Sequence, residues 1–336
     1  MNNSVIYYSV GPLLYCPADH PGVASSLISG SFGKGFSLAF CLEDTIRDNC
    51  VPEAEARLIA TLKEISDAAL QQDFFMPKIF IRIREPDQIP RLFSQMGDLK
   101  QLICGFALPK FSLSNADAYI QAIAGINNGP RTFYMMPILE DASMVHLIRR
   151  YDILYGLKEK LDQAGPLVLN VRVGGNDLCH VFGVRRHAVE TIYDIRPVAQ
   201  ILTDIFTVFG PDYVVSGPVW EYYDGPDWET GLDRELELDR QTGFVGKTII
   251  HPKQIPSVLE HYKVRFSDYE DARAILNWQP ATSNLVSGNL SGERMNEQKT
   301  HTRWAQKILY EAQVYGVQKP GRFRSEPLSL HVQQTG

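Results

Sequence analysis

Short apolar segments alternate with amphipathic segments along most of the chain. The apolar segments predict strands at Pro12–Cys16, Phe36–Leu42, Lys78–Arg84, Ile103–Pro109, Thr132–Leu139, Leu167–Val173, Tyr213–Val215 and Thr248–His251. Apolar residues at helical spacing predict helices between them, at Pro52–Leu70, Ala116–Ile126, Ser143–Leu161 and Ile195–Phe209. Eight strands that alternate with helices indicate an α/β protein, and a closed (β/α)₈ TIM barrel rather than an open sheet.

The pattern changes after His251. Residues 253–278 predict two helices, the polar stretch 279–297 predicts a long loop, and residues 300–315 predict a further helix. The final residues show no clear periodicity, which predicts partial disorder. We therefore expect a barrel over residues 1–262, a C-terminal helical extension over 263–318 and a tail over 319–336.

Two apolar segments end at a carboxylate. TFYMMPILED ends with Glu140 and Asp141, and PLVLNVRVGGND ends with Asp177. Because barrel enzymes carry their chemistry at the C-terminal ends of the strands, Glu140 and Asp177 are candidate metal ligands. Carboxylates without His or Cys companions favour a hard cation such as Mg²⁺. The alternatives are a helix cap, above all for Asp141, and a turn for Asp177.

Further polar residues stand near predicted strand ends. Glu43 and Asp44 follow the second strand, as catalytic candidates or as ion-pair and capping residues. Arg82 and Arg84 are two residues apart on the third predicted strand, so we expect their side chains to share a face. Arginine at a strand end suits the binding of a carboxylate or a phosphate.

Gly175 and Asn176 immediately precede Asp177. Glycine lets the backbone approach a ligand closely, so we include both residues as substrate-binding candidates.

Composition limits the class of protein. A hydrophobic content of 44%, a charged content of 21% and a net charge of −6 describe an ordinary soluble domain and argue against nucleic-acid binding. The five cysteines form no CxxC pair, which favours reduced thiols over disulfides or a zinc site. The N-terminal residues do not resemble a signal peptide, and no apolar run is long enough to span a membrane. We expect a cytoplasmic protein that does not associate with membranes.

The order of several short motifs resembles the HpcH/HpaI aldolase and citrate lyase β-subunit superfamily of Mg²⁺-dependent carbon–carbon bond lyases. The matching segments are LLYCPADHP, FCLEDTIRD, IRIREP, FALPK, PILED, VGGND, GFVGKTIIHPKQI and GERMNEQKTHTRWAQKIL. They follow in the family's order over most of the chain. Within this superfamily, the chain resembles a divergent branch, the C–C bond lyase-like proteins found with tellurite-resistance genes.

The resemblance implies an aldol- or Claisen-type lyase that acts on a 2-keto acid, a hydroxy acid or an acyl-CoA-like substrate through an enolate. It implies that Glu140 and Asp177 bind Mg²⁺, that Arg82 contacts a small carboxylate substrate, and that Glu43 and Asp44 support the site. It also implies a homo-oligomer, either a trimer or a hexamer.

Four positions depart from the family pattern: Cys41, Arg84, Ser291 and Asn296. Members that handle acyl-CoA carry an acid near Ser291, so its absence argues against a CoA thioester substrate. Two other functions stay open. One is a non-catalytic barrel that acts as a ligand-binding or scaffold protein, and the other is a Mg²⁺-dependent enzyme for phosphorylated carboxylates such as phosphoenolpyruvate.

Overall fold

The computed structural model describes residues 4–278, 285–289 and 292–319. The chain forms two compact units, Met1–Tyr262 and Lys263–Gly336, which are described separately. Ser291 and all of the predicted tail after residue 319 lie outside the described residues.

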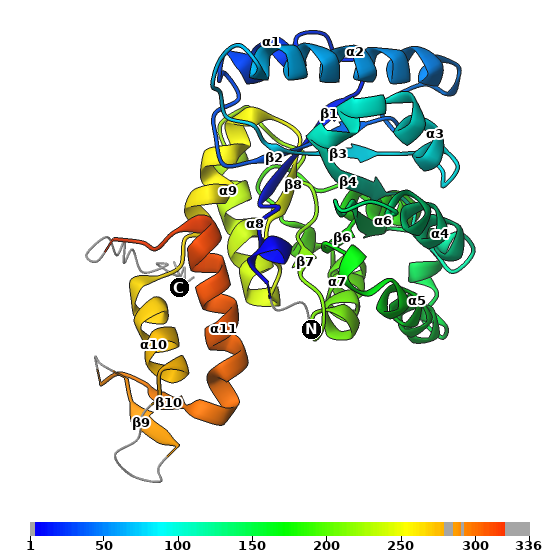
Figure 1. The fold of residues 1–336 in the computed structure, drawn as a ribbon. Coiled ribbons are helices and arrows are strands. Elements are labelled where there is room, and N and C mark those ends of the chain that lie inside the picture. The colour runs from blue at the N-terminus through cyan, green and yellow to red at the C-terminus, as the bar shows by residue number, and fades with distance from the viewer. Residues whose placement is uncertain (1–3, 279–284, 290–291, 320–336) are drawn as a thin grey trace. The chain divides into compact units, whose positions relative to one another are not determined.

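Eight parallel strands form the centre of the first unit (Figure 1). They follow the order β7-β6-β5-β4-β3-β2-β1-β8, and a parallel bridge between Gly217 and Lys247 joins the β7 side to β8. The sheet therefore closes on itself, and the predicted TIM barrel is confirmed. The strands are β1 (Pro12–Pro17), β2 (Ser37–Cys41), β3 (Lys78–Arg82), β4 (Ile103–Leu108), β5 (Tyr134–Leu139), β6 (Val171–Val173), β7 (Val215–Ser216) and β8 (Lys247–Ile249).

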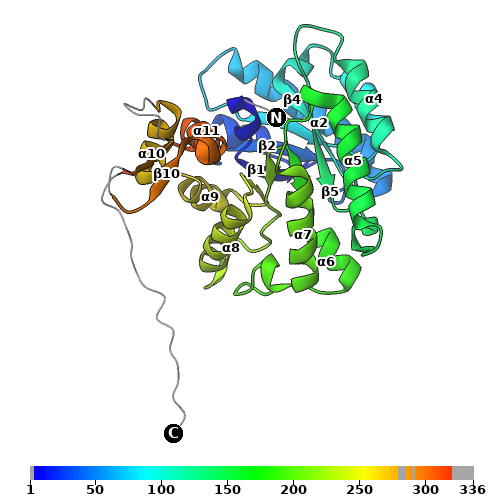
Figure 2. The same ribbon diagram turned by 90° about the horizontal axis from the view of Figure 1, so that it is seen from below.

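Helices surround the strands, as the view from below shows (Figure 2). They are α1 (Val23–Ile28), α2 (Val51–Ala69), α3 (Gln88–Gln95), α4 (Ala116–Ile126), α5 (Arg150–Ala164), α6 (Gly175–Phe182), α7 (Arg196–Phe209), α8 (Trp228–Thr242) and α9 (Ile255–His261). Helix α2 illustrates why they form. Proline lies in its first turn, and Ala54, Leu58, Leu62 and Ile65 are buried at helical spacing.

Two predicted segments begin four or more residues later in the structure. The strand expected over 167–173 begins at Val171, and Leu167 instead ends the 3₁₀ helix η5 (Gly165–Leu167). The helix expected from Ser143 begins at Arg150, after the 3₁₀ helix η4 (Ala142–Val145). Asp141 caps η4, since its Oδ1 accepts a hydrogen bond of 2.9 Å from the backbone N of Ser143. Asp141 is therefore a capping residue.

One glycine shows how tightly the barrel is built. A Cβ on Gly105 of β4 would lie 1.9 Å from the carbonyl oxygen of Tyr134 on β5. Only glycine allows this pairing of β4 with β5, which sets the relative height of the two strand ends.

A group of four buried charged residues, here called the closing cluster, lies where β8 closes the barrel: Arg186, Glu235, Asp239 and Lys247. The Nζ atom of Lys247 lies 2.8 Å from Glu235 Oε1 and 2.7 Å from Asp239 Oδ2. Arg186 Nη1 lies 3.1 Å from Glu235 Oε2. Two cations thus balance two carboxylates, which compensates for the removal of all four side chains from water.

The second unit pairs α10 (Phe266–Leu276) with α11 (Gln298–Tyr315). Its core contains Ala272, Ile275 and Ala305. The predicted loop over 279–297 contains two short antiparallel strands, β9 (Val286–Gly288) and β10 (Met295–Glu297). In the part of the chain that the structure describes, no helix has both the length and the apolar character that a membrane span requires.

Candidate functional site

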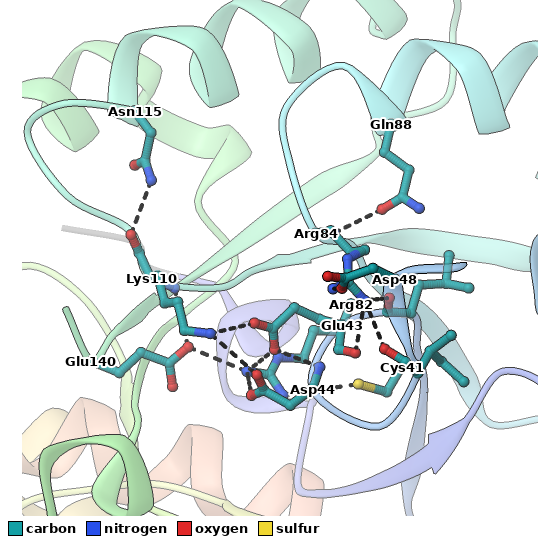
Figure 3. A network of polar contacts seen from close by, with 12 residues as sticks. Cys41, Glu43, Asp44, Asp48, Arg82, Arg84, Gln88, Lys110, Asn115 and Glu140 are labelled. Carbon is teal, nitrogen blue, oxygen red and sulfur yellow. Dashed lines mark hydrogen bonds and ion pairs between the residues drawn. The ribbon is translucent and has the colours of Figure 1, made fainter. Parts of the chain in front are cut away.

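Arg82, the last residue of β3, is the centre of the predicted site (Figure 3). Its buried Nη2 atom lies 2.7 Å from Glu43 Oε2, 2.9 Å from Asp44 Oδ2 and 3.3 Å from Glu140 Oε1. Glu43 and Asp44 follow β2, and Glu140 follows β5. The structure therefore brings four predicted site residues together at the C-terminal ends of the strands, where barrels carry their chemistry.

Glu140 is held from three sides. Its Oε1 accepts from Arg82 and also from the backbone N of Lys110, at 3.1 Å. A Cβ at Gly174, just after β6, would lie 2.0 Å from Glu140 Oε2. The glycine is therefore required for the close approach of the β6 end to this carboxylate.

Asp177 lies in the first turn of α6, which follows the end of the neighbouring strand β6, and it is partly exposed. Its negative charge contributes to the raised pKa of Glu140, so the two carboxylates are close enough to interact. Gly175 and Asn176 precede Asp177 in the same turn. Gly175 is buried and packs against Pro218, whereas Asn176 is exposed. The predicted substrate-binding pair thus forms the start of the helix that carries Asp177.

Arg84 differs from Arg82 in its surroundings. Strand β3 ends at Arg82, so the period-two argument does not extend to Arg84. The Nη1 of Arg84 donates to the carbonyl oxygens of Leu42, Glu43 and Ile46, and its Nη2 pairs with Asp48. These bonds fix the loop after β2, and through it the position of Glu43.

Sequence reasoning missed Lys110, the second residue after β4. Its Nζ lies 2.6 Å from Glu43 Oε1 and 3.2 Å from Asp44 Oδ1 (Figure 3). The signal was its position within the segment FALPK, since it follows an apolar strand just as Glu43 and Glu140 do. We refer to the six charged residues at the strand ends as the mouth cluster: Glu43, Asp44, Arg82, Lys110, Glu140 and Asp177.

Tyr15 of β1 was also missed. Its ring centroid lies 5.5 Å from Arg82 Cζ, so the aromatic face stabilises the guanidinium. Burial raises the pKa of Tyr15, although the charges of Arg172 and Arg82 oppose the change. Tyr15 therefore stays a neutral phenol beside Arg82.

The carboxyl groups of the mouth cluster differ in their affinity for protons. Burial raises the pKa of Glu140 to about 8, with Asp177 and Glu43 adding to the effect and Arg82 opposing it. Burial also raises the pKa of Glu43. For Asp44 the effect of burial is outweighed by hydrogen bonding to Glu43 and by the charges of Arg82 and Lys110, which lower its pKa to about 2.

The donor set suits one hard divalent cation. When ionised, the four carboxylates of the mouth cluster carry −4 and its two cations carry +2, which leaves −2. Among the described residues no group of three or more His, Cys, Asp and Glu side chains could hold a metal. Mg²⁺ commonly binds one or two carboxylates and keeps several waters, so Glu140 and Asp177 fit this ion and do not fit zinc.

Comparisons with known proteins agree with this barrel. A model of a C–C bond lyase family of the TIM-barrel fold matches residues 4–317. The structure of CitE from Mycobacterium tuberculosis in complex with magnesium, acetoacetate and coenzyme A has a TM-score of 0.59 and 19% identity, and the match covers 91% of this chain and 99% of that chain.

Two further solved structures are similar. The citrate lyase β subunit from M. tuberculosis with oxaloacetate and magnesium has a TM-score of 0.50 and 19% identity, over 77% of this chain and 99% of that chain. RipC from Yersinia pestis has a TM-score of 0.51 and 17% identity, over 76% and 95%. No curated protein sequence matches the chain.

Proposed function

The chain belongs to the C–C bond lyase family of the TIM-barrel fold, and we propose that it is a Mg²⁺-dependent lyase that cleaves or forms a carbon–carbon bond. The proposed substrate is a 2-keto acid, a hydroxy acid or an acyl-CoA-like compound. Oxaloacetate, bound in one of the two similar structures from M. tuberculosis, is a 2-keto acid, and the other structure contains coenzyme A together with acetoacetate, a 3-keto acid; both support a small keto acid or an acyl-CoA-like compound.

One observation carries the proposal. The buried Glu140 carboxylate lies against the Arg82 guanidinium at 3.3 Å and interacts with the charge of Asp177. Without a cation, Glu140 resists ionisation, as its raised pKa indicates. Glu140 and Asp177 would hold a divalent cation, which would offset the repulsion between them, and the −2 surplus of the fully ionised mouth cluster matches the charge of such an ion in magnitude.

The residues of this chain then have distinct roles. When bound, Mg²⁺ would supply Lewis-acid stabilisation of the negative charge that develops on the substrate carbonyl oxygen. Arg82 adds a fixed positive charge and hydrogen-bond donors at the same place, where the enolate forms. Glu43 and Asp44 hold the Arg82 guanidinium at 2.7 Å and 2.9 Å, so it is oriented before substrate arrives. The Tyr15 ring lies beside the Arg82 guanidinium and stabilises its positive charge.

Mutation of each proposed ligand tests the metal site. We expect Glu140→Gln and Asp177→Asn each to weaken Mg²⁺ binding, measured by titration calorimetry, by about tenfold or more, because each removes one charged ligand. Asp117→Asn is a matched control, since Asp117 pairs with Lys160 between α4 and α5 and is not a member of the mouth cluster. Unchanged affinity in both site variants would contradict the proposal.

A second measurement tests the chemistry. Enolisation exchanges the methyl hydrogens of pyruvate for deuterium, which NMR detects without knowledge of the natural substrate. We expect Mg²⁺-dependent exchange in the wild type and a loss of about a hundredfold or more in Arg82→Met, the effect of removing one electrostatic donor. Mg²⁺ binding without exchange of pyruvate or 2-ketobutyrate would favour a non-catalytic barrel instead.

The structure gives little support to phosphorylated carboxylates as substrates. Binding of the phosphate group would require both Arg82 and Arg84. The Arg84 guanidinium instead donates hydrogen bonds to carbonyl oxygens of the loop after β2. A cytoplasmic location and a trimer or hexamer stay predictions, and light scattering of the purified protein would test the oligomer.

A further inference from the structure

Lys110 holds an unfavourable backbone conformation. Its φ of 47° is the one positive φ of a non-glycine residue in the part of the chain that the structure describes. Glycine adopts this region without steric cost, and an L-residue does not. Strain of this kind persists where the surroundings enforce it, and it gathers at functional sites.

The bonds around Lys110 show what enforces the conformation. Its backbone N donates to Glu140 Oε1 at 3.1 Å, and its carbonyl oxygen accepts from Asn115 Nδ2 at 3.0 Å. The next residue, Phe111, donates its N–H to the carbonyl oxygen of Ile138 on β5 at 3.1 Å. The backbone is therefore turned toward Glu140, a function that glycine could also perform. The lysine side chain needs a separate explanation.

Lys110 connects Glu140 to two other acids of the mouth cluster, through its backbone on one side and its side chain on the other. The ammonium group bonds to both Glu43 and Asp44, whereas the backbone N–H of the same residue bonds to Glu140. The Lys110 side chain is 48% exposed and the Glu43 side chain is 9% exposed. Lys110 thus lies at the solvent edge of a cluster whose other cation, Arg82, is buried.

A count of charges shows the consequence. When all four carboxyl groups are ionised, Arg82 and Lys110 balance Glu43 and Asp44, which leaves the −2 of Glu140 and Asp177. Without the ammonium the surplus becomes −3. We propose that Lys110 is a positioning residue that orients Glu140 through its backbone and, through its side chain, limits the surplus charge of the site to that of one divalent cation. This inference rests on the proposed Mg²⁺ site.

The proposal predicts that removal of Lys110 strengthens cation binding, whereas loss of a merely structural residue would weaken it. We expect Lys110→Met to bind Mg²⁺ about two- to fivefold more tightly by calorimetry at low ionic strength, the value of a half-exposed ion pair. The gain should shrink in high salt, because screening weakens charges at the solvent edge. Lys110→Arg keeps the charge and should bind Mg²⁺ as the wild type does.

Two more variants separate charge from backbone strain. Lys110→Gly should show the same tighter Mg²⁺ binding as Lys110→Met but a higher melting temperature than Lys110→Met, because glycine accepts the positive φ. Lys160→Met removes a lysine from an ion pair between α4 and α5 and should leave Mg²⁺ affinity unchanged.

The results distinguish this inference from the proposed function. Weaker or unchanged Mg²⁺ binding in Lys110→Met, with wild-type binding that depends on Glu140, overturns the role of Lys110 and leaves the lyase proposal intact. Absence of Mg²⁺ binding in the wild type overturns both.

Discussion

The mouth cluster and the closing cluster are built from the same residue types and differ in balance and access. In the closing cluster, Lys247 and Arg186 offset Glu235 and Asp239, and the side chains are 0–1% exposed. In the mouth cluster the acids outnumber the cations by two, and exposure rises from 3% at Glu140 to 48% at Lys110.

The difference separates a structural use of charge from a functional one. Buried charges cost desolvation energy, and a balanced set with direct ion pairs offsets most of it. The closing cluster has no surplus charge and no exposed side chain, so a ligand has neither access to it nor a net charge to bind. The mouth cluster has two more carboxyl groups than cations and a partly exposed edge, and a cation-binding site requires both features.

The largest expected effect is a loss of stability when the charge balance of the closing cluster is removed by mutation. Lys247→Met leaves Glu235 and Asp239 facing Arg186 alone, so a buried negative charge is uncompensated. We expect the free energy of unfolding to fall by about 3–5 kcal/mol, measured by urea denaturation. Lys160→Met, at an exposed pair, should cost less than about 1 kcal/mol. Equal losses of unfolding free energy in the two variants would show that burial of the closing cluster does not determine the cost of removing its lysine.

The next effect concerns the mouth cluster. Mg²⁺ at about a hundred times its dissociation constant should raise the free energy of unfolding of the wild type by about 2.7 kcal/mol, since the ion binds only the folded chain. In Glu140→Gln, binding that is tenfold weaker or more should limit the increase to about 1.4 kcal/mol or less at the same Mg²⁺ concentration. The comparison fails if Mg²⁺ stabilises both proteins equally, since the ion would then bind elsewhere.

A smaller effect distinguishes the two arginines near the end of β3. Arg84→Met removes three hydrogen bonds to the loop after β2 and the pair with Asp48. We expect a loss of about 1–2 kcal/mol in unfolding free energy because charged hydrogen bonds are lost at a partly exposed site. Mg²⁺ affinity should change less than twofold. A fall of tenfold in affinity would return Arg84 to the binding site.

The same comparison explains how far the sequence predicted the structure. Strand-end residues such as Glu140 and Arg82 were recognisable because each directly follows a long apolar segment, and barrel closure brings such ends together. Helix α8 was missed because its buried positions include Glu235 and Asp239, which interrupt the apolar spacing that marks a helix. Charges that stabilise the fold from inside thus look like surface residues in the sequence.

Two errors have local causes. Arg84 was placed on the face of Arg82 because period two was extended past the end of β3, where the chain leaves the sheet. Lys110 was overlooked because its position after an apolar strand reveals neither its positive φ nor its contacts with residues 67 and 66 positions away.

The smallest effect is a pH dependence at the edge of the mouth cluster. The pKa of Asp44 is lowered to about 2, since Arg82, Lys110 and hydrogen bonding to Glu43 outweigh the effect of burial. In the unfolded chain its pKa is near the ordinary value of about 3.9. The stabilisation from ionised Asp44 is therefore complete above about pH 4 and is lost as the pH falls toward 2. Because this side chain is 46% exposed, solvent screening should keep the effect below about 1 kcal/mol.

Asp44→Asn should be less stable than the wild type at pH 5, and urea denaturation should show that this difference in unfolding free energy disappears between pH 4 and pH 2. If the difference in unfolding free energy between the two proteins stays constant over this range, the charge of Asp44 contributes nothing to stability. The difference in charge balance between the mouth cluster and the closing cluster would then lie at Glu140 and Asp177 alone.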